Sequence, residues 1–259
     1  MADPAGFEAV RDLVRAGRRG ALVTVVAGEG LGAKLLVTAG ETLGSLGEAA
    51  LDERAAAIAR ELLGGEESAA REAAGRKLFI DVFAPQPRLL VIGAVDFAAA
   101  LARAARQAGF RVTVVDPRER FATTERIPDA DEVVVAWPQE YLAASPPDDA
   151  TYAAVLTHEP RLDDPTLEAL LKSPVAYIGA MGSRRAHGER LERLRAAGFG
   201  DDDIARISGP IGLDIGAKTP EETAVSILAE VIAVRHRRAG GRLRDRSAQV
   251  HSLKEREDL

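Results

Sequence analysis

The chain has 259 residues, which is enough for one large domain or two modest ones. Its hydrophobic content of 46% is sufficient for real cores, and its net charge of -6 argues against non-specific binding to nucleic acid. The absence of cysteine excludes disulfides, iron–sulfur clusters, thiolate zinc sites and cysteine nucleophiles.

No apolar run approaches the length of a membrane span, and residues 1–6 lack the charged and then apolar pattern of a signal peptide. We therefore expect a cytoplasmic protein that contacts neither a membrane nor nucleic acid.

The elements predicted before residue 85 are mixed. In chain order they are a helix over 7–14, strands over 21–26 and 34–38, a helix over 51–63 and a strand over 76–83. They predict a small α+β domain over residues 1–84, followed by a linker in which Pro85 and Pro87 interrupt the pattern.

After the linker, strands and helices alternate. Strands are predicted over 88–92, 111–115, 133–136, 153–156 and 175–178, and helices over 96–108, 165–171, 184–197 and 220–238, with a helical turn after Pro138. Continuous apolar strands between helices indicate a parallel sheet covered on both faces. We therefore predict an α/β, Rossmann-like doubly wound domain over 88–239, and a charged, loose tail over 240–259.

Residues 209–223 combine a glycine-rich loop with a strong helix start, in which Thr219 is the N-cap and Glu222 completes a capping box. Lys218 lies beside free backbone N–H groups, an arrangement that suits an anionic ligand. The candidate binding residues of this segment are Gly212, Asp214, Gly216 and Lys218. A plain connection before a well-capped surface helix explains the same residues equally well.

A second loop of this kind follows the strand predicted over 175–178. Its candidate binding residues are Gly179, Gly182, Ser183 and Arg184. A glycine turn that opens a helix beside arginine side chains favours a phosphate. The alternative is a packed strand–helix turn with solvated arginines.

The first strand–helix turn of the second domain tests dinucleotide binding. The expected Gly-x-Gly-x-x-Gly pattern keeps only its first glycine, Gly93. Val95 stands where a pyrophosphate needs close backbone approach, and Asp96 adds negative charge where the phosphate would rest. Asp116 does end the next strand, as a ribose-binding carboxylate would. The pattern supports the fold strongly and NAD(P) as a cofactor only weakly.

Other chemistry is sparse. The histidine spacing suggests no metal site, and no serine lies in a nucleophile-elbow pattern, so we assign neither metal ligands nor catalytic residues. His158 follows a predicted strand at its carboxyl end, where ligands bind in open α/β sheets, although a hydrogen-bonded loop histidine is an equal alternative. We expect His158 and the two glycine loops to surround one cleft, with Asp214 bonding a polar ring edge of the ligand or fixing Lys218.

The chain resembles the XdhC/CoxI family, the maturation factors of xanthine and carbon monoxide dehydrogenases. The resemblance is most specific over residues 157–165, 177–185 and 209–222, and in the first half it covers 32–37 and 44–47. After Gly47 the family usually continues with two more glycines, then Cys or Ala. This chain has Glu48, Ala49 and Ala50 there, so the loop has lost two glycines and has no cysteine.

The resemblance implies a chaperone that binds molybdenum cofactor as cargo, protects it while a terminal sulfur is installed, and delivers it to a molybdenum hydroxylase without turnover of its own. The implied partners are that hydroxylase and a cysteine desulfurase, and we expect a homodimer. The alternatives are an NAD(P)-dependent oxidoreductase and a ligand-free adaptor.

Overall fold

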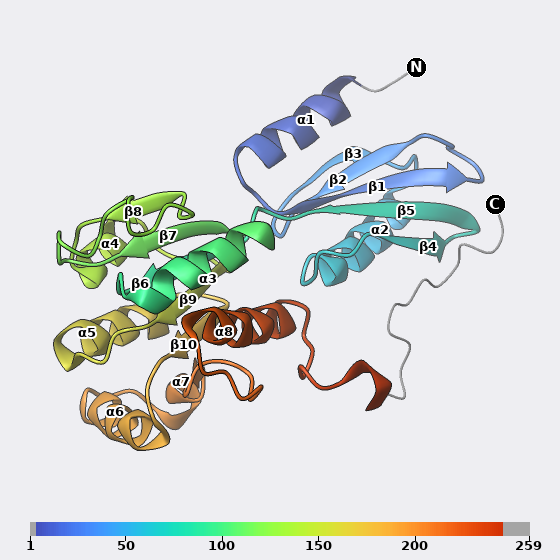
Figure 1. Ribbon diagram of the computed structural model, residues 1–259. Helices are drawn as coiled ribbons and strands as arrows, with labels where there is room; N and C mark the ends of the chain where they lie inside the picture. Colours follow the sequence, from blue (N-terminus) through green and yellow to red (C-terminus); the bar gives the residue numbers. More distant parts are fainter. Residues whose placement is uncertain (1–3, 246–259) are drawn as a thin grey trace. The chain divides into compact units, whose positions relative to one another are not determined.

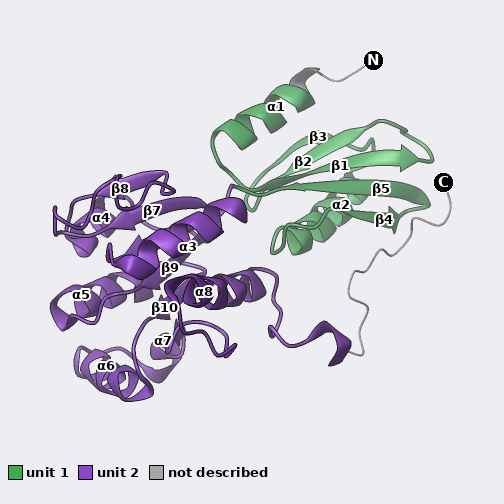
Figure 2. Cartoon of the chain, viewed as in Figure 1, with its two compact units in different colours: residues 1–85, 247–259 green, residues 86–246 purple. Residues whose placement is uncertain are grey.

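The computed structural model describes residues 4–245, in two compact units that divide between Pro85 and Gln86 (Figure 2). Most of the tail predicted over 240–259 lies outside the described residues. Its described part ends in a short 3₁₀ turn, Leu243–Asp245. Within the described residues, no helix is both long and apolar enough to cross a bilayer.

The first unit is a five-stranded antiparallel sheet with the strand order β3-β2-β1-β5-β4. The strands are β1 (Gly20–Ala27), β2 (Lys34–Val37), β3 (Thr42–Ser45), β4 (Ala69–Ala73) and β5 (Arg76–Phe83), and the helices are α1 (Pro4–Arg15) and α2 (Ala49–Leu62). Alternate residues of β1, such as Val23, pack with α2 on one face. Helix α1 lies on the other face of the sheet (Figure 1), and its Leu13 lines a cavity together with Leu36 of β2.

The second unit is a six-stranded parallel sheet with the order β11-β10-β9-β6-β7-β8. Its strands are β6 (Arg88–Ile92), β7 (Arg111–Val115), β8 (Glu132–Val134), β9 (Thr151–Val155), β10 (Tyr177–Ala180) and β11 (Ile207–Ser208). The order reverses between β6 and β9, which defines the switch point of a Rossmann sheet.

Helices cover both faces of this sheet (Figure 1). They are α3 (Asp96–Gln107), α4 (Pro138–Ala144), α5 (Pro160–Leu171), α6 (Arg184–Ala196), α7 (Asp201–Ile204) and α8 (Pro220–Arg235). Leu89 and Val91 pack with α3 and α8, whereas Leu90 and Ile92 pack with α5 on the opposite face. A strand that is buried on both faces needs a continuous apolar run, which is why β6 was readable from sequence. The predicted α/β class and the doubly wound sheet are confirmed.

One boundary error affects a candidate residue. The strand predicted over 175–178 is β10, Tyr177–Ala180, so Gly179 lies within a strand and not in the loop after it. A Cβ on Gly179 would overlap the side chains of Ile211 and Tyr177. Close packing beside the strand, rather than approach of a ligand, therefore accounts for this glycine.

Candidate functional site

The carboxyl edge of the parallel sheet gathers the loops that the sequence singled out. The chain after each strand hydrogen-bonds to the end of the neighbouring strand: Leu156 N–H to Ile92 O at 2.9 Å, Met181 N–H to Val155 O at 2.8 Å and Ile211 N–H to Ala180 O at 3.1 Å. These bonds bring the loops after β6, β9, β10 and β11 together at one edge. This edge is where ligands bind in open α/β sheets.

Asp116 at the end of β7 has no exposed surface and is fully engaged within the chain. Its carboxylate accepts hydrogen bonds from Ala94 N–H at 2.8 Å and Arg118 N–H at 2.9 Å, and the Arg118 guanidinium binds it at 2.8 and 2.6 Å. Burial alone would raise the pKa of Asp116, but the bonds from Arg118 and Ala94 outweigh it and hold that pKa below its ordinary value. Asp116, which would bind a ribose in a dinucleotide site, instead holds the turn after β6 through its hydrogen bond with Ala94.

The negative charge of Asp96 at the start of α3 is also paired. Arg126 lies 3.3 Å from Asp96, and both Arg126 and Arg118 lie over the ring of Phe121, at 5.3 and 4.6 Å from its centre. The loop after β7 therefore packs its own side chains over the turn at which a dinucleotide would bind. Gly93, at the centre of this turn, lies against Thr157 of the neighbouring loop.

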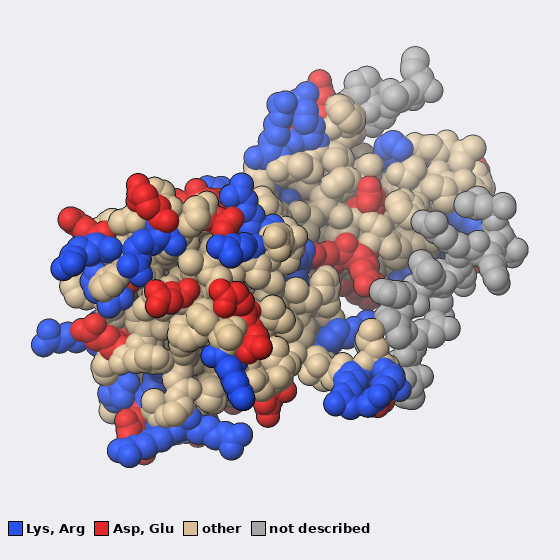
Figure 3. Space-filling view, in the orientation of Figure 1, with Lys and Arg blue, Asp and Glu red and all other residues tan. Residues whose placement is uncertain are grey.

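The turn from β10 into α6 presents groups that suit an anion. Gly182 has a φ of 142°, and Ser183 caps α6 by accepting a hydrogen bond from Ala186 N–H at 3.1 Å. Arg184 is exposed, and its side chain makes no hydrogen bond or ion pair with a described residue. Basic side chains also gather over α6 on the face shown in Figure 3.

The loop before α8 divides into an anchored part and a free part. Gly212 N–H donates to Glu230 at 2.7 Å, and a Cβ on Gly212 would overlap Ser226, so this glycine has a packing role. Asp214, Gly216 and Lys218 are exposed. They belong to the loop after β11, which Ile211 anchors at the edge, and their place in a binding site stays a prediction.

The capping box of α8 forms as the sequence predicts. Glu222 accepts hydrogen bonds from the backbone N–H groups of Lys218 at 2.7 Å and Thr219 at 3.1 Å, which lowers its pKa. This carboxylate takes up two of the N–H donors that were expected to attract an anion at Lys218. The case for an anion at the start of α8 is correspondingly weaker than at the start of α6.

A buried polar cluster, missed from sequence, joins the loops after β9 and β10. Arg190 of α6 donates to Met181 O at 2.9 Å and lies 3.3 Å from Asp163 of α5, and Asp163 also accepts the hydroxyl of Thr157. Arg190 and Asp163 are only 3% and 2% exposed. His158, next to Thr157, is exposed at the same edge. The sequence carried only a faint signal, since the partners lie 27 residues apart.

The loop after β3 contains a second unforeseen pair. Glu48, which stands where the resemblance implies a glycine, forms an ion pair with the buried Arg76, whose Nη1 also donates to Leu46 O at 2.9 Å. The extra negative charge in this loop is therefore offset within the first unit.

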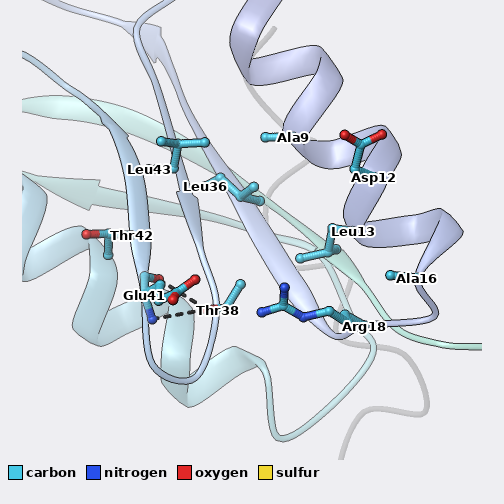
Figure 4. Close-up of a pocket in the computed structure, with 10 residues that line it drawn as sticks. All are labelled: Ala9, Asp12, Leu13, Ala16, Arg18, Leu36, Thr38, Glu41, Thr42 and Leu43. Carbon is cyan, nitrogen blue, oxygen red and sulfur yellow. Dashed lines mark hydrogen bonds between the residues drawn. The ribbon is translucent and has the colours of Figure 1, made fainter.

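A cavity of about 520 Å³ also lies in the first unit, between α1 and the β2–β3 hairpin (Figure 4). Leu13, Leu36 and Leu43 line its apolar wall, and its charged groups include Arg18 with Asp12 and Glu41. None of its lining residues belongs to the predicted site, and one arginine against two carboxylates offers no positive field for an anion. Among residues 4–245, no group of three His, Asp or Glu side chains is placed to hold a metal ion.

Two family models match the chain, each within one unit. The XdhC and CoxI family model matches residues 13–77, and the XdhC Rossmann domain model matches residues 89–231. The second match alone spans more than half of the chain.

Curated relatives are similar over part of their length. A probable xanthine dehydrogenase subunit from Bacillus subtilis is 36% identical over 62% of this chain and 46% of the relative. The molybdenum cofactor insertion chaperone PaoD of Escherichia coli is 34% identical over 34% of this chain and 28% of the relative. The chain thus spans less than half the length of these relatives.

A solved structure shares the fold. The crystal structure of a xanthine dehydrogenase from Bacillus halodurans matches with a TM-score of 0.68 and 25% identity, over 89% of this chain and 66% of the other. Together with the two family models, this similarity shows that the chain belongs to the XdhC and CoxI family.

Proposed function

We propose that this protein is a cytoplasmic maturation factor that binds molybdenum cofactor and delivers it to a molybdenum hydroxylase of the xanthine or carbon monoxide dehydrogenase type. The cofactor is cargo that the protein holds and releases, and it is not consumed. A cysteine desulfurase would supply the terminal sulfur while the cofactor is bound.

The observation that carries this proposal is which polar groups at the carboxyl edge of the parallel sheet are bonded within the chain and which remain free. The features that would bind a dinucleotide are engaged within the chain, because Asp116 is paired with Arg118 and Ala94. The groups that favour an anion remain at the turn from β10 into α6, at the same edge. Such a turn can hold the phosphate group of a pterin cofactor without a ribose-binding carboxylate.

A further observation supports cargo binding. A relative that matches this chain is named a molybdenum cofactor insertion chaperone. We propose that His158, Gly182, Ser183 and Arg184 form the binding surface, with Gly93, Gly179, Gly212 and Asp116 as its structural support.

The test is direct transfer of the cofactor. The full chain is incubated with molybdenum cofactor released from a donor enzyme, passed through a desalting column and assayed for molybdenum and for oxidised pterin fluorescence. We expect both to elute with the protein at near 1:1, and the complex to activate a cofactor-free molybdenum hydroxylase. Elution of pterin and metal in the salt fraction alone would contradict the proposal.

A further inference from the structure

The turn from β10 into α6 lies over a buried guanidinium with unused donors. Arg190 is 3% exposed, and only its Nη2 is bonded, to Met181 O and Asp163. Its Nε and Nη1 are buried and have no hydrogen-bond partner among the described residues. A buried donor without an acceptor is costly, and a donor on a charged group is more so.

One of the two unpartnered nitrogens, Nη1, lies beneath the turn. Gly182 leaves the space of a side chain empty, and a Cβ placed there would lie 3.9 Å from Nη1 and 3.8 Å from the bonded Nη2. Gly182 itself is partly exposed, so one residue separates the guanidinium from solvent. An acceptor atom that enters this turn would meet Arg190 from above.

A second orphaned atom lies on the same side of α6. The Nδ1 of His187 is buried without a partner among the described residues, and its ring packs against Gly209. Burial and the charge of Arg190 lower the pKa of His187, so the ring stays neutral near pH 7. Two consecutive turns of α6 thus direct unmet polar atoms towards the loops at the carboxyl edge.

The rim of the turn adds donors that point outward. In a helix of 13 residues, the first backbone N–H groups, here those of Arg184 and Arg185, have no intrahelical acceptor. The hydroxyl of Ser183 accepts from Ala186 N–H and retains its own hydrogen to donate. The dipole of α6 adds partial positive charge at the same point.

The surrounding charges leave Arg190 as the cation beneath the turn. On α6, Arg193 is bound by Asp164 at 2.6 and 3.0 Å, and Arg185 pairs with Glu189 at 2.9 Å. The acid that Arg190 faces is Asp163, and burial raises the pKa of Asp163 because the hydrogen bond from Thr157 and the charge of Arg190 offset only part of its desolvation. Asp163 is therefore a weak counter-ion for Arg190, and an anion of higher charge would pair with Arg190 more strongly.

We propose that the turn over residues 181–185 is a phosphate-binding site in which Arg190 is the buried cation and Asp163 is the carboxylate that competes with the phosphate for it. Phosphate fits better than a carboxylate because backbone N–H groups, a hydroxyl and a guanidinium approach from different directions and match several oxygens around one tetrahedral centre. This inference identifies the phosphate subsite of the proposed function but does not depend on the pterin, since any phosphate group supplies the same chemistry.

The first experiment titrates the full chain with inorganic pyrophosphate by calorimetry and compares two arginine variants of the same helix. Arg190→Gln removes the buried cation, and we expect affinity to fall about tenfold or more. Arg193→Gln removes a surface arginine from the same helix and serves as the matched control, with affinity unchanged. Acetate, a carboxylate of single charge, should bind at least tenfold more weakly than pyrophosphate.

The second experiment exploits the acid partner. Asp163→Asn keeps the shape of the side chain but removes the charge that competes for Arg190, so we expect pyrophosphate to bind about threefold more tightly or better. A purely structural role of the pair predicts the opposite, because loss of the pair would loosen the turn and weaken binding.

Several outcomes would overturn the site. The first is equal affinity of Arg190→Gln and Arg193→Gln for pyrophosphate, and the second is weaker binding of pyrophosphate by Asp163→Asn. The third is no binding of pyrophosphate to the unmodified protein at about 10 mM, a concentration that would reveal even a very weak complex. If Arg190→Gln does not fold, a crystal structure of the unmodified protein with pyrophosphate decides, since the anion must lie at residues 181–185. Cofactor transfer without pyrophosphate binding would refute this site alone, whereas pyrophosphate binding without cofactor transfer would refute the proposed function alone.

Discussion

Gly93 and Thr157 touch across the switch point of the parallel sheet, so closely that a Cβ on Gly93 would overlap Cγ2 of Thr157. Gly93 also has a φ of 101°, which side chains rarely adopt. Its lack of a side chain is therefore required by the neighbouring loop, whether or not a ligand binds there.

The substitution Gly93→Ala should be strongly destabilising. The positive φ and the overlap together should cost about 2–5 kcal/mol of unfolding free energy. The matched control is Gly216→Ala, because Gly216 has a φ of 74° but nothing within 4 Å of a Cβ. Denaturant unfolding should show a loss of only about 1–2 kcal/mol for the control. Equal losses would mean that the contact with Thr157 is unimportant.

The same pair shows what the sequence can reveal. Gly93 was recognisable as the first glycine of a strand–helix turn, because the buried strand before it is continuous and apolar. Its partner was not, since Thr157 follows a strand that is distant in the chain and adjacent only in the sheet. The fold was thus predictable from local pattern, whereas the reason for the glycine was not.

Two short strands were missed for a related reason. β3 (Thr42–Ser45) is exposed throughout and includes Gly44, and β11 (Ile207–Ser208) has two residues. Neither shows an apolar period, so pairing with a neighbour defines them. The pairing of charges was not predictable either. Asp96 and Glu48 bring negative charge into two loops, and only the fold shows that Arg126 and Arg76 offset it.

NAD(H) should bind weakly. Val95 occupies the close-approach position and Asp116 is engaged by Arg118, so neither the pyrophosphate nor the ribose finds its usual partner. We expect a dissociation constant on the order of 1 mM or weaker, equivalent to about 4 kcal/mol of binding free energy. Calorimetry with NAD and NADP tests this, and a micromolar constant for either would favour an oxidoreductase.

Asp116 should make stability depend on acid pH. The pKa of Asp116 in the folded state lies below its ordinary value of 3.8, so the ionised group stabilises the fold above that value. This contribution disappears as the pH falls through the folded-state pKa. Near neutral pH, Asp116→Asn should lower the unfolding free energy by about 2–3 kcal/mol, because charged hydrogen bonds to Arg118 are lost.

Denaturant unfolding of both proteins from about pH 7 to about pH 2 measures this effect. The difference between them should be constant near neutrality and shrink in the most acidic range. A difference that persists unchanged at the acidic end would show that Asp116 acts through its shape and not through its charge.

A fragment that begins at Pro87 should fold alone. The two hydrophobic clusters of the parallel sheet draw all their residues from the second unit, and the cluster that contains Val23 and α2 draws all of its residues from the first. A unit with its own core and all its strands is expected to fold independently. Circular dichroism should show one cooperative melt. Expression only as aggregate, or a melt without cooperativity, would show that the two units depend on each other and that the boundary at residues 84–87 is misplaced.

Arg184→Ala should separate binding from stability at the start of α6. Arg184 is exposed and makes no bond to a described residue, so its removal should change the unfolding free energy by no more than about 0.5 kcal/mol. A guanidinium that binds the phosphate of a ligand contributes about 1.5–3 kcal/mol, so affinity for an anionic ligand should fall by that amount. Pyrophosphate titration and a denaturant curve on the same preparations measure both quantities.

Lys218→Ala is the informative comparison, because Lys218 is also exposed but lies at a helix start whose N–H donors are already taken by Glu222. A larger loss of affinity for Lys218→Ala than for Arg184→Ala would place the anion at α8, and unchanged affinity with a large loss of stability for Arg184→Ala would make Arg184 a structural residue.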